Sequence, residues 1–173
     1  MNVLLVSPKT PTTFWSFKHA LKFVSKRSAF PPLGLLTVAG MLPDEWNLRL
    51  VDLNVSRLRD AQIRWADYVM IGAMIVQKES VREVIRRCQT LGKPVIGGGP
   101  LFTTGYQELS DEFGADLHCV VGEAEHIMAD VVADMQTGTL RRVYEASGRP
   151  DISLAPIPRW DLIRPKHYVS MSA

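Results

Sequence analysis

The sequence predicts an α/β domain: a five-stranded parallel sheet, doubly wound, with helices on both of its faces. Three observations lead to this fold class. Short, continuous apolar runs recur along the 173 residues, as expected of strands that are covered on both sides. Amphipathic segments with helical spacing separate these runs. Strand and helix alternate along most of the chain, which is typical of a parallel sheet with right-handed crossovers.

The five strands are expected at the apolar runs. These are residues 2–7, 46–52, 67–74, 94–97 and 118–121. Residues 142–145 are a candidate further strand at the edge of the sheet. Helices are expected at residues 33–42, 60–66, 79–91 and 123–136. The helix at 79–91 carries apolar residues on one face and arginine and glutamate on the other, and Gly92 follows it as a cap.

Two segments exceed a minimal fold. The connection at 8–32 has 25 residues, whereas a strand-to-helix loop usually has about 2–6. Within it, apolar residues and lysines repeat every three or four positions over 14–27. This spacing predicts an amphipathic helix, which serves either as an ordinary surface helix or as a lid or docking surface.

The second segment is a proline-rich tail at 148–173, which follows a domain expected at 1–147. Its prolines exclude a continuous helix or a central strand. Its apolar residues nevertheless predict that it packs along a surface, either of this domain or of a missing one. Because the chain stops within an apolar pattern, we expect it to be a fragment of a longer protein.

Composition narrows the functional classes. The net charge of +2 is too small to indicate nucleic-acid binding. No apolar run reaches the ~20 residues of a membrane span. The two cysteines lie in a predicted helix and a predicted strand, so no disulfide framework is expected, and a cytoplasmic location is the default.

The strongest local signal is a run of three glycines after the fourth strand, Gly97, Gly98 and Gly99. Glycine lets a bulky ligand approach the backbone, and open α/β sheets bind ligands at the carboxyl ends of their strands. The same run is also compatible with a tight turn and no ligand. No glycine-rich dinucleotide or Walker loop follows the first strand, whereas a flavin mononucleotide phosphate near Ser7 and Thr10 remains open. We predict no catalytic residues and no metal ligands, since no histidine or cysteine cluster has suitable spacing.

Several short motifs occur in a fixed order. They are Phe-Pro-Pro-Leu-Gly-Leu-Leu at 30–36, Val-Asp-Leu-Asn at 51–54, Trp-Ala-Asp at 65–67, Gly-Gly-Gly-Pro at 97–100, Gly-Glu-Ala-Glu at 122–125 and Pro-Ile-Pro-Arg-Trp-Asp at 156–161. In these motifs the chain resembles the amino-terminal cobalamin-binding domain of cobalamin-dependent radical S-adenosylmethionine enzymes. The resemblance spans residues 1 to about 170 and implies a Rossmann-like domain of the cobalamin-binding type.

The resemblance also implies a set of cofactor-binding residues that follow four strands. They are Ser7, Pro8, Lys9, Thr10, Ala73, Met74, Ile75, Gly97, Gly98, Gly99, Pro100, Gly122 and Glu123. The broader family carries a cobalt-binding histidine after the first strand, where this chain has Ser-Pro-Lys. Its serine after the third strand is replaced as well. The departure implies that water, a backbone group or nothing occupies the lower axial position of cobalt.

For the full-length protein, the resemblance implies S-adenosylmethionine, a 4Fe-4S cluster and a radical domain in the same polypeptide. Methyl transfer or related carbon–carbon bond formation on a small molecule or lipid is the implied reaction. The cluster would need three cysteines in the next segment, and this chain has two cysteines, 31 residues apart. Two alternatives remain: a flavin- or nucleotide-binding sensor domain, and a non-catalytic interaction domain.

Overall fold

The structure is a computed structural model that describes residues 1–11, 26–146, 148 and 155–171. Most of the amphipathic segment expected at 14–27 therefore lies outside the described residues. The described part is built on one parallel sheet in the order β2-β1-β3-β4-β5-β6. Its strands are β1 (Asn2–Ser7), β2 (Asn47–Asp52), β3 (Tyr68–Gly72), β4 (Val95–Gly98), β5 (Leu117–Val121) and β6 (Val143–Glu145).

The sheet thus has six strands, and the expected count of five was one short. β6 pairs in parallel with β5 through Val143, Tyr144 and Glu145. Tyr144 anchors this short edge strand, because its ring is 2% exposed and its hydroxyl donates to Asp134 Oδ2 at 2.8 Å. A single buried tyrosine in a three-residue strand is a weak pattern in sequence.

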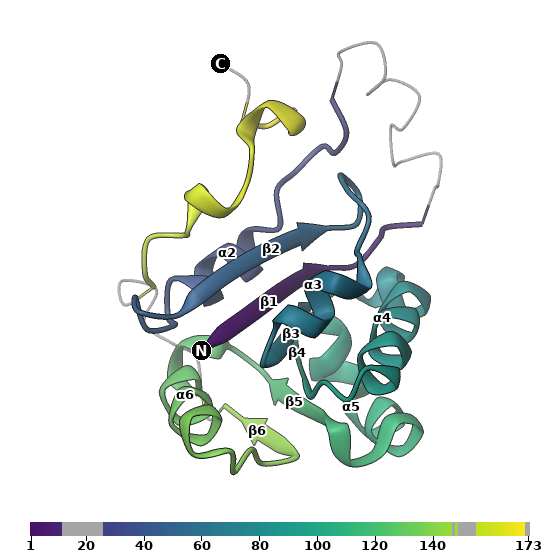
Figure 1. The fold of residues 1–173 in the computed structure, drawn as a ribbon, viewed down its shortest axis with the longest axis vertical. Helices are drawn as coiled ribbons and strands as arrows, with labels where there is room; N and C mark the ends of the chain where they lie inside the picture. Colours follow the sequence, from purple (N-terminus) through teal and green to yellow (C-terminus); the bar gives the residue numbers. More distant parts are fainter. Residues whose placement is uncertain (12–25, 147, 149–154, 172–173) are drawn as a thin grey trace.

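Helices cover both faces, which confirms the doubly wound α/β class (Figure 1). One face carries α2 (Leu33–Ala39) and α6 (Met128–Thr137); the other carries α3 (Asp60–Trp65), α4 (Lys78–Thr90) and α5 (Pro100–Phe113). α5 was not among the helices expected from the sequence. Gly105 interrupts its regular backbone with φ −126°, and this break weakens the helical pattern.

One connection departs from the expected right-handed crossovers. The chain steps in one direction along the sheet from β3 through β4 and β5 to β6. α4 and α5 lie on one face, but Val131 and Met135 of α6 pack with Met70 and Ile96 on the opposite face. The β5–α6–β6 crossover therefore has the opposite hand to the two before it. The expectation of right-handed crossovers was therefore wrong at the connection to this edge strand.

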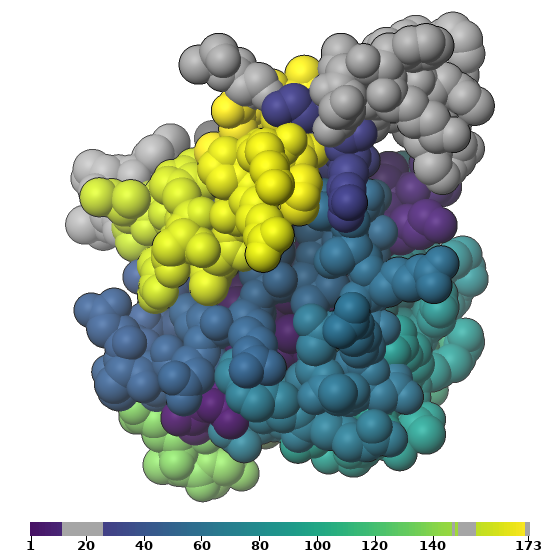
Figure 2. Space-filling model, turned by 45° about the horizontal axis from the view of Figure 1, so that its top comes forward, coloured from purple at the N-terminus to yellow at the C-terminus, as the bar shows by residue number. Residues whose placement is uncertain are grey.

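The C-terminal segment packs along this domain over the residues that the structure describes. The amide of Arg159 donates to Leu36 O at 3.0 Å, and Leu162 packs against Leu48 and Leu50 of β2. Further on, Tyr168 forms a parallel bridge with Ser28. In Figure 2 the segment, in yellow, lies against the dark-blue residues that precede α2. In the described residues, no helix is both long and apolar enough to cross a membrane.

Candidate cofactor site

A cavity of ≈ 1990 Å³ opens at the carboxyl ends of the strands. Small-molecule sites usually measure about 300–1,000 Å³, so this one has room for an unusually large ligand. It reaches down to the sheet between the two helices of one face, where Met70, Ile96 and Val120 form its floor. Leu35 of α2 and Met128 of α6 line its sides.

Most of the expected binding residues line this cavity. Ten of the thirteen do so: Ser7, Lys9, Thr10, Ala73, Met74, Gly98, Gly99, Pro100, Gly122 and Glu123. They follow β1, β3, β4 and β5, whose carboxyl ends meet at the same edge of the sheet. Pro8, Ile75 and Gly97 do not line it.

The three glycines do three different things. A Cβ on Gly97 would lie 2.1 Å from Phe102 Cε1, so this glycine makes room for α5 inside the core. A Cβ on Gly98 would have only Val120 within reach, at 3.7 Å, and its backbone faces the cavity. Gly99 has φ +89°, a conformation that L-residues rarely adopt, and caps the start of α5. The ligand signal in the sequence therefore resides mainly in Gly98.

Side chains from the loop after β2 and from the start of α4 hold the turn after β1. Gln77 Nε2 donates to Pro8 O at 2.6 Å, and the amides of Lys9 and Thr10 donate to Ser80 Oγ and Asn54 Oδ1, both at 2.9 Å. The sequence indicates neither Gln77 nor Ser80 as a site residue, and Asn54 enters only as part of the motif at 51–54. Gln77 sits three residues after Met74, the spacing of a helix-start cap, but nothing in sequence says which distant loop its amide reaches.

A buried carboxylate lies at the same end of the sheet. Asp52 is 4% exposed, and its Oδ1 accepts hydrogen bonds from the backbone amide and Nδ2 of Asn54 at 2.9 and 2.8 Å. Its Oδ2 accepts from the Tyr168 hydroxyl at 3.1 Å. Burial raises the pKa of Asp52, although the bonds from Asn54 and Tyr168 oppose that shift. Burial, with the nearby Asp52 carboxylate, also raises the pKa of Tyr168, so the hydroxyl stays protonated as the donor.

Comparison with known proteins agrees with this geometry. A family model described as "B12 binding domain" matches residues 24–132. The chain belongs to the B12-binding domain family. An uncharacterized methyltransferase of Synechocystis sp. is 40% identical over 99% of this chain. The hopanoid C-2 methylase of Rhodopseudomonas palustris is 30% identical over 97%. A bacteriochlorophyllide d C-12(1)-methyltransferase of Chlorobaculum tepidum is 26% identical over 88%. The chain spans about a third of the length of each relative.

The residues of this B12-binding domain fit a bulky ligand with both apolar and polar groups, because the lining combines aliphatic side chains with polar ones such as Lys9, Asn54 and Glu123. The cavity is floored by aliphatic side chains and by glycine backbone at Gly72 and Gly98. Its rim exposes apolar groups that a small domain normally buries: Phe30 is 74% exposed, Leu33 52% and Met74 56%. Large exposed apolar groups beside a cavity are typical of ligand or protein contacts.

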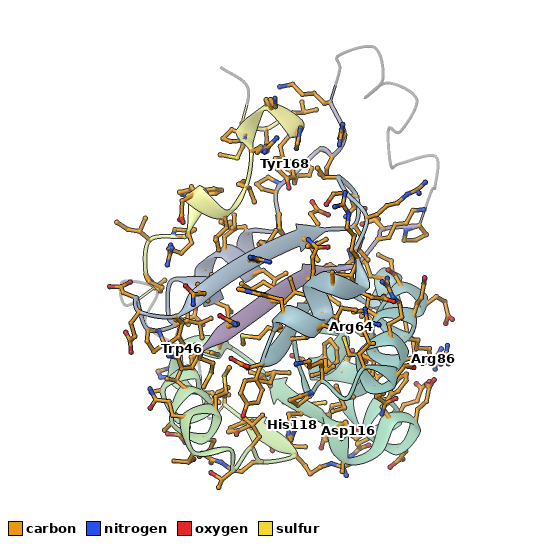
Figure 3. The ribbon with its side chains drawn as sticks, viewed as in Figure 1. Trp46, Arg64, Arg86, Asp116, His118 and Tyr168 are labelled. Carbon is orange, nitrogen blue, oxygen red and sulfur yellow. The ribbon has the colours of Figure 1, made fainter. Side chains whose placement is uncertain are left out.

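Within the described ranges, no histidine lines the cavity of the B12-binding domain. His118 hydrogen-bonds Arg141 O and lies at the opposite end of the sheet from Tyr168 (Figure 3). His19 falls outside the described residues. No cluster in the described residues could hold a metal ion. Cys88 and Cys119 are buried and unpaired, and burial raises the pKa of Cys88 to about 12, so its thiol is not reactive.

Proposed function

We propose that this B12-binding domain holds cobalamin in the cavity between α2 and α6, at the carboxyl ends of β1, β3, β4 and β5. The observation that carries the proposal is the glycine-lined slot beneath the strand-end loops, in a cavity too large for an ordinary metabolite. In this proposal the part of the cavity lined by Ile96, Gly98 and Val120 takes an arm of the ligand, and the part between the loops takes the macrocycle.

The cofactor-binding residues in this proposal are the ten lining residues and, beside them, Pro8 and Ile75. Ser7, Lys9 and Thr10 border one side of the cavity, and Gly122 and Glu123 border the other. Gly97 binds nothing in this proposal, because its face is filled by Phe102. The chain itself supplies binding and orientation; bound cobalamin supplies methyl-group transfer.

For the whole protein we propose a cobalamin-dependent radical S-adenosylmethionine methyltransferase or related carbon–carbon bond-forming enzyme. The printed activities of the relatives, a hopanoid methylase and a bacteriochlorophyllide methyltransferase, support methyl transfer. S-adenosylmethionine, a 4Fe-4S cluster and a small-molecule or lipid substrate would belong to the following domain. The proposed boundary falls at residue 147, and the proposed compartment is the cytoplasm, where the two unpaired cysteines would stay reduced.

The domain should be purified, incubated with hydroxocobalamin or with flavin mononucleotide, desalted, and examined by absorbance. We expect cobalamin to remain bound in about equimolar amount and flavin to be lost. Retention of flavin alone would support a sensor domain, and retention of neither would support an interaction domain.

The same cobalamin sample, reduced to cobalt(II), tests the lower axial position. We expect an electron paramagnetic resonance spectrum without nitrogen hyperfine splitting, because no described histidine reaches the cavity. Splitting that disappears in a His19→Ala variant would identify an imidazole ligand outside the described residues and contradict this expectation.

A further inference from the structure

The turn Pro8–Thr10 after β1 is held by side chains from other segments of the chain. Among the described residues, no backbone-to-backbone hydrogen bond is made by Pro8, Lys9 or Thr10. Their polar groups are instead paired with side chains of two other segments: Asn54 in the loop after β2, and Gln77 and Ser80 at the start of α4. The position of this part of the cavity wall therefore depends on these side chains.

Gln77 is the most committed of the three. It is 7% exposed, and its Nε2 donates to Pro8 O at 2.6 Å and to Thr10 Oγ1 at 3.2 Å. Its Oε1 accepts from the amide of Met74 at 2.8 Å. Both amide hydrogens and the carbonyl oxygen are thus used within the protein, so Gln77 has little capacity left for a polar contact with a ligand.

These bonds join two loops that both line the cavity. Lys9 and Thr10 belong to the turn after β1, and Met74 belongs to the turn between β3 and α4. One buried amide therefore fixes the spacing between the two turns on one side of the site. A wall that is fixed before binding loses less conformational freedom on binding, and affinity rises accordingly.

We propose that Gln77 is a positioning residue for the cofactor: it clamps the Pro8–Thr10 turn to the Met74 turn and so sets the shape of the cavity before cobalamin binds. This inference rests on the proposed function for its ligand, but the clamp itself is testable without one.

The test compares Gln77→Met with Gln89→Met. Gln89 is a matched control near the far end of α4, the helix that Gln77 precedes as N-cap: its Nε2 donates to Phe113 O at 2.7 Å, remote from the cavity. In the apo domain, Gln77→Met should accelerate hydrogen exchange at the amides of Lys9 and Thr10, whereas Gln89→Met should leave both unchanged. Hydroxocobalamin affinity should fall about tenfold, ~1.4 kcal/mol, in Gln77→Met only.

Ser80→Ala supplies a second variant, because alanine is tolerated in the first turn of a helix and only the acceptor for the Lys9 amide is removed. It should accelerate exchange at Lys9 but not at Thr10, with a smaller loss of affinity. Unchanged exchange and unchanged affinity in Gln77→Met would overturn the proposal, as would equal losses in Gln89→Met. If Gln77→Met does not fold, a Ser80→Ala variant with unchanged Lys9 exchange and affinity overturns it. Failure of the wild-type domain to bind cobalamin would count against the proposed function, while the exchange results would still decide the clamp.

Discussion

The two faces of the sheet are packed differently near the carboxyl ends of the strands. On the face of α3, α4 and α5, the core is continuous up to the strand ends, where Ala73 and Val121 are buried. On the face of α2 and α6, the packing stops at Ile96 and Val120, and a cavity begins above them. Among the described residues, three of the four buried polar ones, Ser7, Asp52 and His118, also lie on strands with their side chains toward this second face.

The difference is visible within one dipeptide. Successive strand residues face opposite sides of a sheet. Gly97 therefore faces the closed side, which is packed by α3, α4 and α5, and Gly98 faces the open side, where the cavity lies between α2 and α6. Gly97 is small because Phe102 occupies its space, whereas Gly98 is small next to an empty slot. Adjacent glycines thus have unrelated causes, and a glycine run does not mark a ligand site along its whole length.

The largest effect on folding is expected from Gly97→Ala. The added Cβ would lie 2.1 Å from Phe102 Cε1 and 2.4 Å from its Cζ, so the ring and α5 must shift. Overpacking of this kind costs about 1–3 kcal/mol or more, and we place this variant at ~3 kcal/mol of lost unfolding free energy, measured by urea denaturation. Adding Phe102→Leu should recover part of the loss, because the smaller side chain vacates the contact. Additive losses in the double variant would contradict a direct clash.

The open side is tested with Gly98→Val. Its Cβ would make only an ordinary contact with Val120 at 3.7 Å, and valine suits a strand. The unfolding free energy, measured by thermal melting, should therefore change by no more than ~1 kcal/mol. The added methyl groups would occupy the slot, and we expect cobalamin affinity to fall about a hundredfold, ~2.7 kcal/mol. Gly98→Ala should give an intermediate loss. Wild-type affinity in both variants would place the cofactor elsewhere.

The sequence predicted the layers of this fold well, because continuous apolar strands and amphipathic helices are local patterns. It also placed ten binding candidates around one cavity, since the carboxyl ends of parallel strands converge. It gave β6 only as a candidate edge strand, because the three residues of this strand depend on the burial of Tyr144, and it counted Gly97, which does not line the cavity, among the binding residues. The side of the sheet that a glycine faces becomes informative only when the packing on both sides is known.

The hydrogen bonds of Gln77, Asn54 and Tyr168 could not be predicted from the sequence for a related reason. Their hydrogen bonds join residues 69, 44 and 116 positions apart. A polar residue with such a distant partner has no local periodicity to reveal it. Asp52 Oδ1 caps the turn after β2 by accepting from the amide of Asn54, and its Oδ2 accepts from Tyr168, which adds a tie to the C-terminal segment.

The smallest expected effect is the pH dependence of stability that the buried Asp52 gives to the open side. Burial raises the pKa of Asp52 above its ordinary 3.8, so between these two values the folded protein binds more protons than the unfolded chain. Stability contributed by this group is therefore highest below pH 3.8, falls as pH rises through the window, and is constant above it. Asp52→Asn stays neutral: its Oδ1 still accepts from Asn54, and its Nδ2 can donate to the Tyr168 oxygen. The stability of Asp52→Asn relative to wild type should consequently increase from acid toward neutral pH and then level off. Melting temperatures of both proteins between about pH 3 and 7 provide the measurement, and taking their difference cancels the exposed carboxylates of the α4–α5 side, whose acid titration is common to both. A difference that does not vary with pH would mean that the hydrogen bonds from Asn54 and Tyr168 fully offset the effect of burial on the pKa of Asp52.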